Sequence, residues 1–206
     1  MAKANQTKLA AKLQMYVILA VLTAIVIVLQ SFAGAIPFGP FTITLSLVPI
    51  ILGAILYGPF AGAFLGAVFG AVVCVSVVSG TDPGGHLMFQ QLPALTLFLC
   101  ILKSTLAGFI AGLVCRYLSK KNLYVGAVTA AVICPIVNTG ILACGMLAFY
   151  SDLVTGWALG AGYSNAFLYI VLGMVGINFL VETAINLVLV PVIVTVIRLF
   201  NKNNID

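Results

Sequence analysis

The sequence predicts an all-α integral membrane protein, a bundle of six transmembrane helices with both termini on the cytoplasmic side. Of its 206 residues, 63% are hydrophobic and 6% are charged, whereas a soluble domain has about 25% charged residues to cover its surface. Several apolar runs approach the ~20 residues that a helix needs to cross a ~30 Å hydrocarbon core, and the strands of a β-barrel would instead alternate over ~10 residues. We therefore expect one membrane domain over residues 1–206 and no soluble domain.

The breaks between the apolar runs set the expected spans. The first run is longer than the roughly 7–15-residue apolar core of a signal peptide, so we expect it to be retained as a span. A Gly- and Pro-rich external connection, Ala33–Phe41, precedes a shorter second span, and the tight turn Tyr57–Phe60 precedes the third. In chain order the six spans cover approximately residues 15–32, 42–57, 60–78, 93–116, 124–149 and 167–199.

Glycines recur every fourth residue at the start of the third span, at Gly58, Gly62, Gly66 and Gly70. Residues four apart share one face of a helix, and small residues on that face let two helices approach closely in lipid. This pattern predicts a close helix contact within the bundle.

The distribution of charge supports this topology. With six spans, eight of the basic residues fall on one side of the membrane, and Asp82 and Asp152 fall on the other. The positive-inside rule makes the basic side cytoplasmic, so the net charge of +5 reports topology and gives no support for nucleic-acid binding. The basic residues are Lys3, Lys8, Lys12, Arg116, Lys120, Lys121, Arg198 and Lys202.

Common catalytic and cofactor motifs are absent from the sequence. It has no Gly-x4-Gly-Lys phosphate loop, no HExxH, no GxSxG and one histidine. The five cysteines lie within or at the ends of apolar runs without metal-ligand spacing, which favours small core residues over a disulfide framework or a metal site. We therefore expect no enzyme, no metal and no cofactor in this chain, although an intramembrane enzyme built on Lys103 and Glu182 remains an alternative.

The sixth span carries Asn178, Glu182 and Asn186, four residues apart, so they form one polar stripe on a helix. A carboxylate at mid-bilayer costs about 2.5–3.5 kcal/mol, so Glu182 is expected to face the interior of the bundle. Lys103 is the only Lys or Arg inside an apolar run. These residues indicate an interior polar site.

The fifth span adds Asn138, which follows Pro135 by three residues. Proline removes a backbone donor, and the freed carbonyl adds a polar group to the interior. Depth can be counted from the basic residue at the cytoplasmic end of each span, at ~1.5 Å of rise per residue. Lys103 then lies about 20 Å above Arg116, Asn138 about 26 Å above Lys121 and Glu182 about 24 Å above Arg198. The three spans thus bring polar groups to one level in the outer half, where a pocket open to the outside is expected.

Two external loops lie above this level. Ser79–Leu92 supplies His86, Gln90 and Gln91, either as part of a movable lid or as a solvated loop with one incidental histidine. Tyr150–Asn165 contains Trp157, which suits the membrane interface and is also a candidate ligand contact.

The order of several segments resembles the substrate-binding S components of energy-coupling factor (ECF) vitamin transporters. They are Ala20-Val-Leu-Thr-Ala24 in the first span, the Pro/Gly loop before a short second span, Leu56-Tyr-Gly-Pro-Phe-Ala-Gly62, and Lys103-Ser-Thr-Leu-Ala-Gly-Phe-Ile-Ala-Gly112. The resemblance covers essentially the whole chain and is weak for the vitamin.

The resemblance implies a subunit that captures a micronutrient from outside, in a pocket capped by the loops after spans one and three. Here these are Ala33–Phe41 and Ser79–Leu92. It also implies that Ala20 and Ala24 contact a transmembrane coupling subunit, although ordinary packing within the chain is an equally good interpretation. Two ATPase subunits would complete the complex and use the ATP, in a bacterial plasma membrane.

The expected ligand depends on the partner of Lys103. If Lys103 is unpaired it suits a carboxylate, Asn138, Asn178 and Asn186 suit hydroxyls or amides, and pantothenate is the leading candidate. If Lys103 pairs with Glu182, a pyridoxine-type compound or riboflavin fits better, or the pair only fixes the helices. Two further alternatives are a self-sufficient proton-coupled carrier, in which Glu182 exchanges protons, and an accessory subunit without a ligand.

Overall fold

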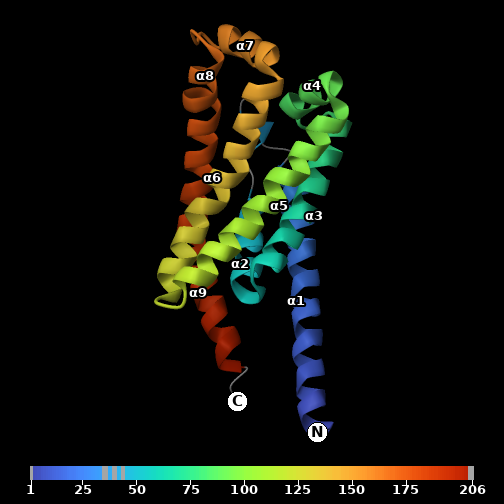
Figure 1. Ribbon diagram of the computed structural model, residues 1–206, viewed down its shortest axis with the longest axis vertical. Helices are drawn as coiled ribbons and strands as arrows, with labels where there is room; N and C mark the ends of the chain where they lie inside the picture. The colour runs from blue at the N-terminus through green and yellow to red at the C-terminus, as the bar shows by residue number, and fades with distance from the viewer. Residues whose placement is uncertain (1, 34–36, 39–40, 43–44, 204–206) are drawn as a thin grey trace.

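The protein is a bundle of long helices with shorter helices at one end (Figure 1). The structure, a computed structural model, describes residues 2–33, 37–38, 41–42 and 45–203, and within these the side chains of 174–178 and of several residues near the chain ends are not described. In chain order the elements are α1 (Ala2–Ala33), β1 (Pro37–Phe38), β2 (Phe41–Thr42), α2 (Leu47–Tyr57), α3 (Pro59–Ser79), α4 (Pro83–Gln91), α5 (Pro93–Leu118), α6 (Leu123–Phe149), α7 (Ser151–Gly160), α8 (Ala166–Leu168), the π-helix η1 (Tyr169–Val175) and α9 (Gly176–Asn203).

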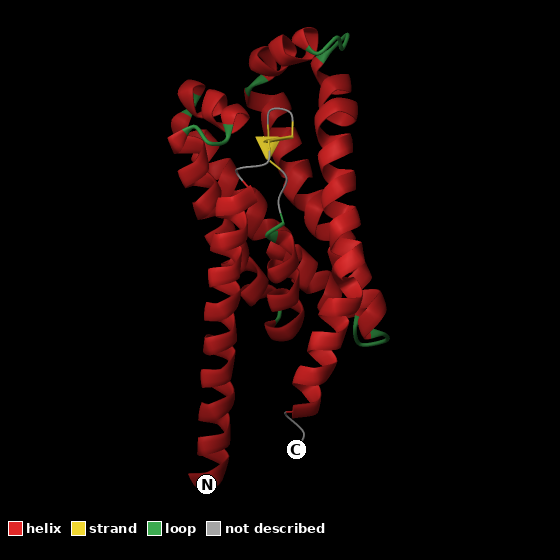
Figure 2. Cartoon of the chain, turned by 180° about the vertical axis from the view of Figure 1, so that it is seen from behind, coloured by secondary structure: helices red, strands yellow, loops and turns green. Residues whose placement is uncertain are grey.

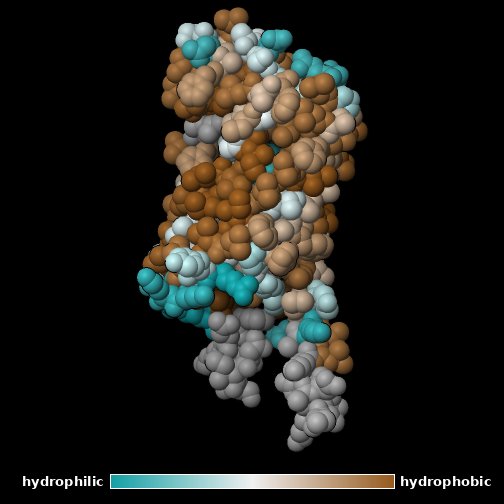
Figure 3. All heavy atoms as spheres, viewed as in Figure 1, coloured by the Kyte–Doolittle hydropathy of each residue, from teal (hydrophilic) through white to brown (hydrophobic). Residues whose placement is uncertain are grey.

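Five helices among the described residues are long and apolar enough to cross a membrane. They comprise Lys12–Phe32, Pro59–Ser79, Pro93–Leu118, Leu123–Phe149 and Phe179–Leu199. In the space-filling view a hydrophobic belt separates hydrophilic rims at the two ends of the molecule (Figure 3). The all-helical membrane architecture expected from the composition is therefore present.

Both chain termini lie at one end of the bundle, together with the α2–α3 and α5–α6 turns (Figure 1). We call this the basic end, because Arg116, Lys120 and Lys121 lie at the α5–α6 turn. The opposite end, here called the far end, carries α4 and α7. Because the first helix begins and the last helix ends at the same end of the bundle, the arrangement agrees with an even number of membrane crossings.

The second span is shorter than predicted. The sequence indicated a helix over about 42–57, but α2 has 11 residues and begins at Leu47, while Phe41 and Thr42 form a strand paired with Pro37 and Phe38 (Figure 2). Hydropathy does not separate a short apolar strand from the start of a helix. Leu47, Ile50 and Ile51 have no exposed surface, so α2 lies inside the bundle and not at its lipid face.

The two external loops also contain helices that the prediction missed. Asp82 caps α4, since its Oδ1 accepts a hydrogen bond from the Gly85 N–H at 3.1 Å, and Pro83 occupies the first helical turn. In the other loop, α7 continues directly from the end of α6 at Tyr150. With α8 and the start of η1, α4 and α7 enclose a second apolar cluster, which includes Met88, Met146 and Ile170.

Glycines bring α3 and α5 into backbone contact. A Cβ at Gly66 would overlap the Ser104 carbonyl, one at Gly62 would overlap the Gly108 carbonyl, and one at Gly70 would lie 2.8 Å from the Cys100 oxygen. The predicted close contact is thus confirmed for Gly62, Gly66 and Gly70.

Gly58 does not belong to this contact. Nothing lies within 4 Å of a Cβ placed there, and its φ of +90° lies in the left-handed region, which favours glycine. The turn between α2 and α3, and not helix packing, explains this glycine.

Candidate functional site

Lys103 lies in a small enclosed cavity, in the half of α5 that is nearer the far end of the bundle. The side chain is 9% exposed, and the cavity is also lined by Asp82, Thr96, Cys100 and Leu142. Its volume of about 10 Å³ is close to that of one water probe. The buried cation therefore faces a group from the start of α4 and a side chain from α6.

The sequence prediction missed Asp82 as a site residue, although Asp82 lines the same cavity as Lys103. Its side chain is 8% exposed. Burial raises the pKa of the Asp82 carboxyl above its ordinary value, while the Gly85 N–H and the positive charge of Lys103 act in the opposite direction. The Asp-Pro pair, typical of a helix start, was the signal that could have placed this carboxyl at a buried cap and not in a solvated loop.

Glu182 on α9 is buried, like Lys103 on α5. It is 1% exposed and lies close enough to Cys134 for their charges to interact. Lys103 lies near Asp82, Cys74 and Cys100. Glu182 is not among the described residues that line the Lys103 cavity.

Helix α6 passes near both of these charged residues. Cys134, Asn138 and Leu142 are four residues apart and share one face, with Cys134 near Glu182 and Leu142 beside Lys103. The eight residues from Cys134 to Leu142 correspond to about 12 Å of helix. Asn138 lies between them, 4% exposed, and its Oδ1 is buried without a hydrogen-bond partner among the described residues.

Asn186 has a structural explanation that the sequence did not reveal. Pro135 has no N–H, so the Ala131 carbonyl one turn earlier in α6 lacks its helical donor. The Asn186 Nδ2 group donates a hydrogen bond to that carbonyl at 3.3 Å. Asn186 is 2% exposed and thus replaces the missing backbone bond across the α6–α9 interface.

The other predicted residues lie as follows. Asn178 is on α9 one turn before Glu182, and its side chain lies outside the described set. His86 on α4 lies 2.9 Å from the Val77 carbonyl through Nδ1 and 3.0 Å from Gln90 Nε2 through Nε2. Since a carbonyl only accepts, His86 Nδ1 donates to Val77 and Gln90 donates to His86.

His86 therefore joins α4 to the end of α3, while Gln90 and Gln91 are exposed on α4. Trp157 on α7 is half-buried against the apolar cluster at the far end. The first lid segment, Ala33–Phe41, lies partly outside the described residues, and its strand β2 packs against α4. Ala20 and Ala24 are both exposed on α1.

The role of Asn186 leads to a stability prediction. Asn186→Leu is expected to lower the free energy of unfolding by about 1–3 kcal/mol, because the Ala131 carbonyl then stays buried without a donor. Thermal unfolding in detergent would measure the change. Pro135→Ala restores the backbone N–H, so in that background Asn186→Leu is expected to cost less, and an equal loss in both backgrounds would contradict the explanation.

Comparisons with known proteins agree on one class. Residues 14–194 match the family model described as "ECF transporter, substrate-specific component". The pantothenic acid transporter PanT of Lactococcus lactis subsp. cremoris (strain MG1363) is 27% identical over 198 residues, which cover 91% of this chain and 95% of that protein. The solved structure of ThiT from Listeria monocytogenes has a TM-score of 0.60 and 20% identity, and the match covers 88% of this chain and 96% of that one. At this identity, the likeness to ThiT shows the fold alone.

Proposed function

Because the chain belongs to the ECF transporter substrate-specific components, we propose that it is the pantothenate-binding subunit of an ATP-driven importer. It is a multi-pass protein of the plasma membrane, and members of its family are components of transporters. In the proposed complex it captures the vitamin with high affinity, and a transmembrane coupling subunit and two ATPase subunits supply the energy. The chain itself is proposed to need no cofactor and to catalyse no reaction.

The arrangement of polar groups around α6 supports this ligand. Pantothenate has a carboxylate at one end and hydroxyl and amide groups along the rest of the molecule. Lys103 offers a buried positive charge for a carboxylate, and the Asn138 Oδ1 is a buried acceptor suited to a hydroxyl or an amide N–H. The similarity to PanT points to the same vitamin.

The proposal rests on the buried Oδ1 acceptor of Asn138. Along α6, Asn138 lies between Leu142, which is beside Lys103, and Cys134, which is near Glu182. Glu182 would accept hydroxyl hydrogen bonds at the other end of the ligand. Met88 and Leu99 of the apolar cluster at the far end also line the Lys103 cavity, so they separate Lys103 from bulk water. His86 and Gln90 fix α4 above the site, and we propose that they support the cap and that Gln91 and Trp157 contact the ligand as it enters.

The direct test is to purify the protein alone in mild detergent and identify co-purifying small molecules by mass spectrometry. After removal of that molecule, pantothenate, pyridoxine, riboflavin and thiamin would be titrated back by calorimetry. Recovery of pantothenate near one-to-one, with tight rebinding, is expected. Tight binding of another vitamin in place of pantothenate would overturn the choice of ligand, and an empty protein that binds none of the panel would overturn the capture function.

The coupling surface can be tested separately. Ala20 and Ala24 lie one turn apart on the exposed part of α1, so replacing both by Leu adds bulk without disturbing the core. The double variant is expected to bind pantothenate normally but to co-purify with the coupling subunit at least ~10-fold less, since ~1.4 kcal/mol of lost contact suffices. Val21→Leu, at the neighbouring exposed position, is the control. Normal recovery of the complex by the double variant would refute the assignment.

A further inference from the structure

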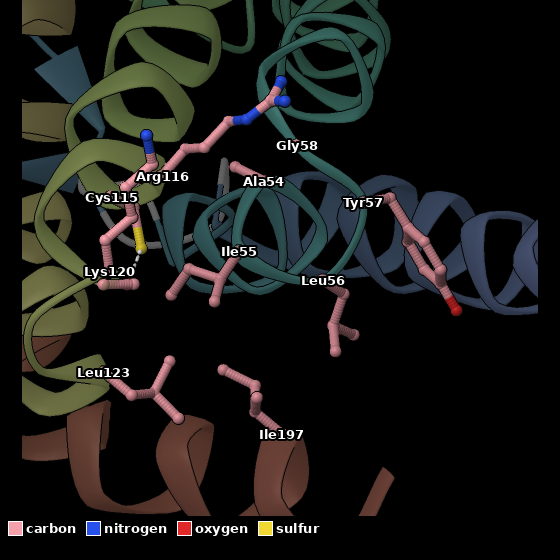
Figure 4. Close-up of a pocket in the computed structure, with 11 residues that line it drawn as sticks. Ala54, Ile55, Leu56, Tyr57, Gly58, Cys115, Arg116, Lys120, Leu123 and Ile197 are labelled. Carbon is pink, nitrogen blue, oxygen red and sulfur yellow. Dashed lines mark hydrogen bonds between the residues drawn. The ribbon is translucent and has the colours of Figure 1, made fainter. Parts of the chain in front are cut away.

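A second cavity, unconnected with the proposed vitamin site, opens at the basic end. Its volume is about 610 Å³, within the range of small-molecule sites. It lies between the last turn of α2, the end of α5, the start of α6 and the last part of α9 (Figure 4). The proposed capture function makes no use of it.

One side of this cavity is strongly basic. Arg116 in the last turn of α5 and Lys120 in the turn after α5 line it, four residues apart, and both are exposed. Lys121 follows at the same turn, and no acidic residue occurs among the described residues that line the cavity. Tyr57 and Ser119 also line the cavity, and the Ser119 hydroxyl lies 3.2 Å from the Cys115 sulfur. The cavity therefore offers two positive charges without an internal counter-ion.

The opposite side is apolar. Ile55 and Leu56 come from α2, Leu123 from the start of α6 and Ile197 from α9. Figure 4 shows Ile55, Leu123 and Ile197 around one common space, with the Arg116 side chain extended toward Gly58. A soluble anion would satisfy the charges but leave this apolar wall in water, at a cost that scales with its area.

From this combination we propose that the cavity binds an anionic phospholipid. Its phosphate lies between Arg116 and Lys120, and the upper part of one acyl chain covers Ile55, Leu123 and Ile197. The position fits, because Arg116 and Lys120 lie at the junction of two membrane-spanning helices, Pro93–Leu118 and Leu123–Phe149, where headgroup phosphates are found. Basic pockets between such helices bind anionic headgroups. An amphiphile with one negative charge matches both sides of the cavity, which neither free phosphate nor a neutral lipid does.

Native mass spectrometry and thermal unfolding of the full chain would test the proposal, with phosphatidylglycerol titrated into protein held in phosphatidylcholine-containing micelles. One phosphatidylglycerol is expected to bind and to raise the melting temperature. Arg116→Gln/Lys120→Gln is expected to weaken this binding about 10–30-fold, since each basic residue contributes roughly a factor of five to anionic-lipid binding. Both residues are exposed, so the variant is expected to melt normally in phosphatidylcholine alone.

Matched variants distinguish a specific phospholipid site from a general effect of positive charge on lipid binding. Lys12→Gln/Lys121→Gln removes two charges from the same end without touching the lining, and it is expected to keep the binding of phosphatidylglycerol. Arg116→Lys/Lys120→Arg keeps the charge and is expected to bind within a few-fold of the parent. Equal losses in the two glutamine variants would overturn the site in favour of diffuse attraction to the membrane.

Two further outcomes would also overturn it. Equal stabilisation by inorganic phosphate or glycerol phosphate would identify a plain anion site. Loss of the coupling subunit from Arg116→Gln/Lys120→Gln, with lipid binding unchanged, would identify a protein-contact surface. The readouts use the protein without its vitamin, so failure here leaves the pantothenate proposal unaffected.

Discussion

Gly66→Leu is expected to prevent recovery of the folded protein, the largest effect that a single substitution should have here. Gly66 meets the backbone of Ser104 and Thr105, and neither can move without separating α3 from α5. Overpacking against flexible side chains costs about 1–3 kcal/mol, and a clash with helix backbone is expected to exceed about 4 kcal/mol. The yield of monodisperse protein after size-exclusion chromatography, with the melting temperature, measures the effect.

Gly140→Leu is the matched control for this experiment. Gly140 lies inside α6, and nothing lies within 4 Å of a Cβ placed on it. The control is expected to fold with the melting temperature of the parent or slightly above it, since leucine favours helix over glycine by up to about 1 kcal/mol. Similar melting temperatures for Gly66→Leu and Gly140→Leu would show that the α3–α5 contact does not hold the bundle together.

Lys103→Met should cause the largest loss of ligand binding. Removing one partner of a buried charge pair in a binding site costs about 2–5 kcal/mol, which corresponds to a loss of pantothenate affinity of roughly 30-fold to several thousand-fold. Calorimetric titration of the purified variant measures it. Leu87→Ala, at an exposed position of α4 with no proposed ligand contact, is expected to change the affinity much less.

A second variant distinguishes a ligand contact from a scaffold role. Lys103→Met leaves Asp82 buried without its cation and is expected to lower stability as well. Adding Asp82→Asn removes that charge, so the double variant should regain stability. If Lys103 binds the carboxylate of pantothenate, the affinity of the double variant is expected to stay low. Parental affinity in the double variant would rule that contact out.

Much of the membrane architecture could be predicted from the sequence, because hydropathy and glycine spacing are local signals. The spans near 60–78, 93–116 and 124–149 agree closely with α3, α5 and α6. The strand at Phe41–Thr42 was missed because an apolar run of that length fits either structure. The helices α4 and α7 were missed because their Gly-rich composition resembles that of loops.

The candidate site was less predictable, since contacts between helices depend on rotation and register. The polar residues Lys103, Asn138 and Glu182 were identified as interior, and all three are buried. Their partners were not predictable from spacing along one helix. Asp82 reaches Lys103 only because α4 folds back over α5, and Asn186 compensates for Pro135 only because α6 and α9 pack in one register.

The short helix α2 contributes to an apolar layer inside the bundle that opposes the passage of ions through the protein. Its 11 residues rise about 16 Å, roughly half the hydrocarbon thickness, and Leu47, Ile50 and Ile51 are fully buried between the longer helices. Toward the basic end the same apolar core continues through Val190, Ile193 and Val194 of α9. An ion that reached Lys103 or Glu182 from the far end would have to cross this layer of apolar side chains, at the cost of its desolvation. This apolar layer is therefore expected to oppose the leakage of protons and ions through the subunit.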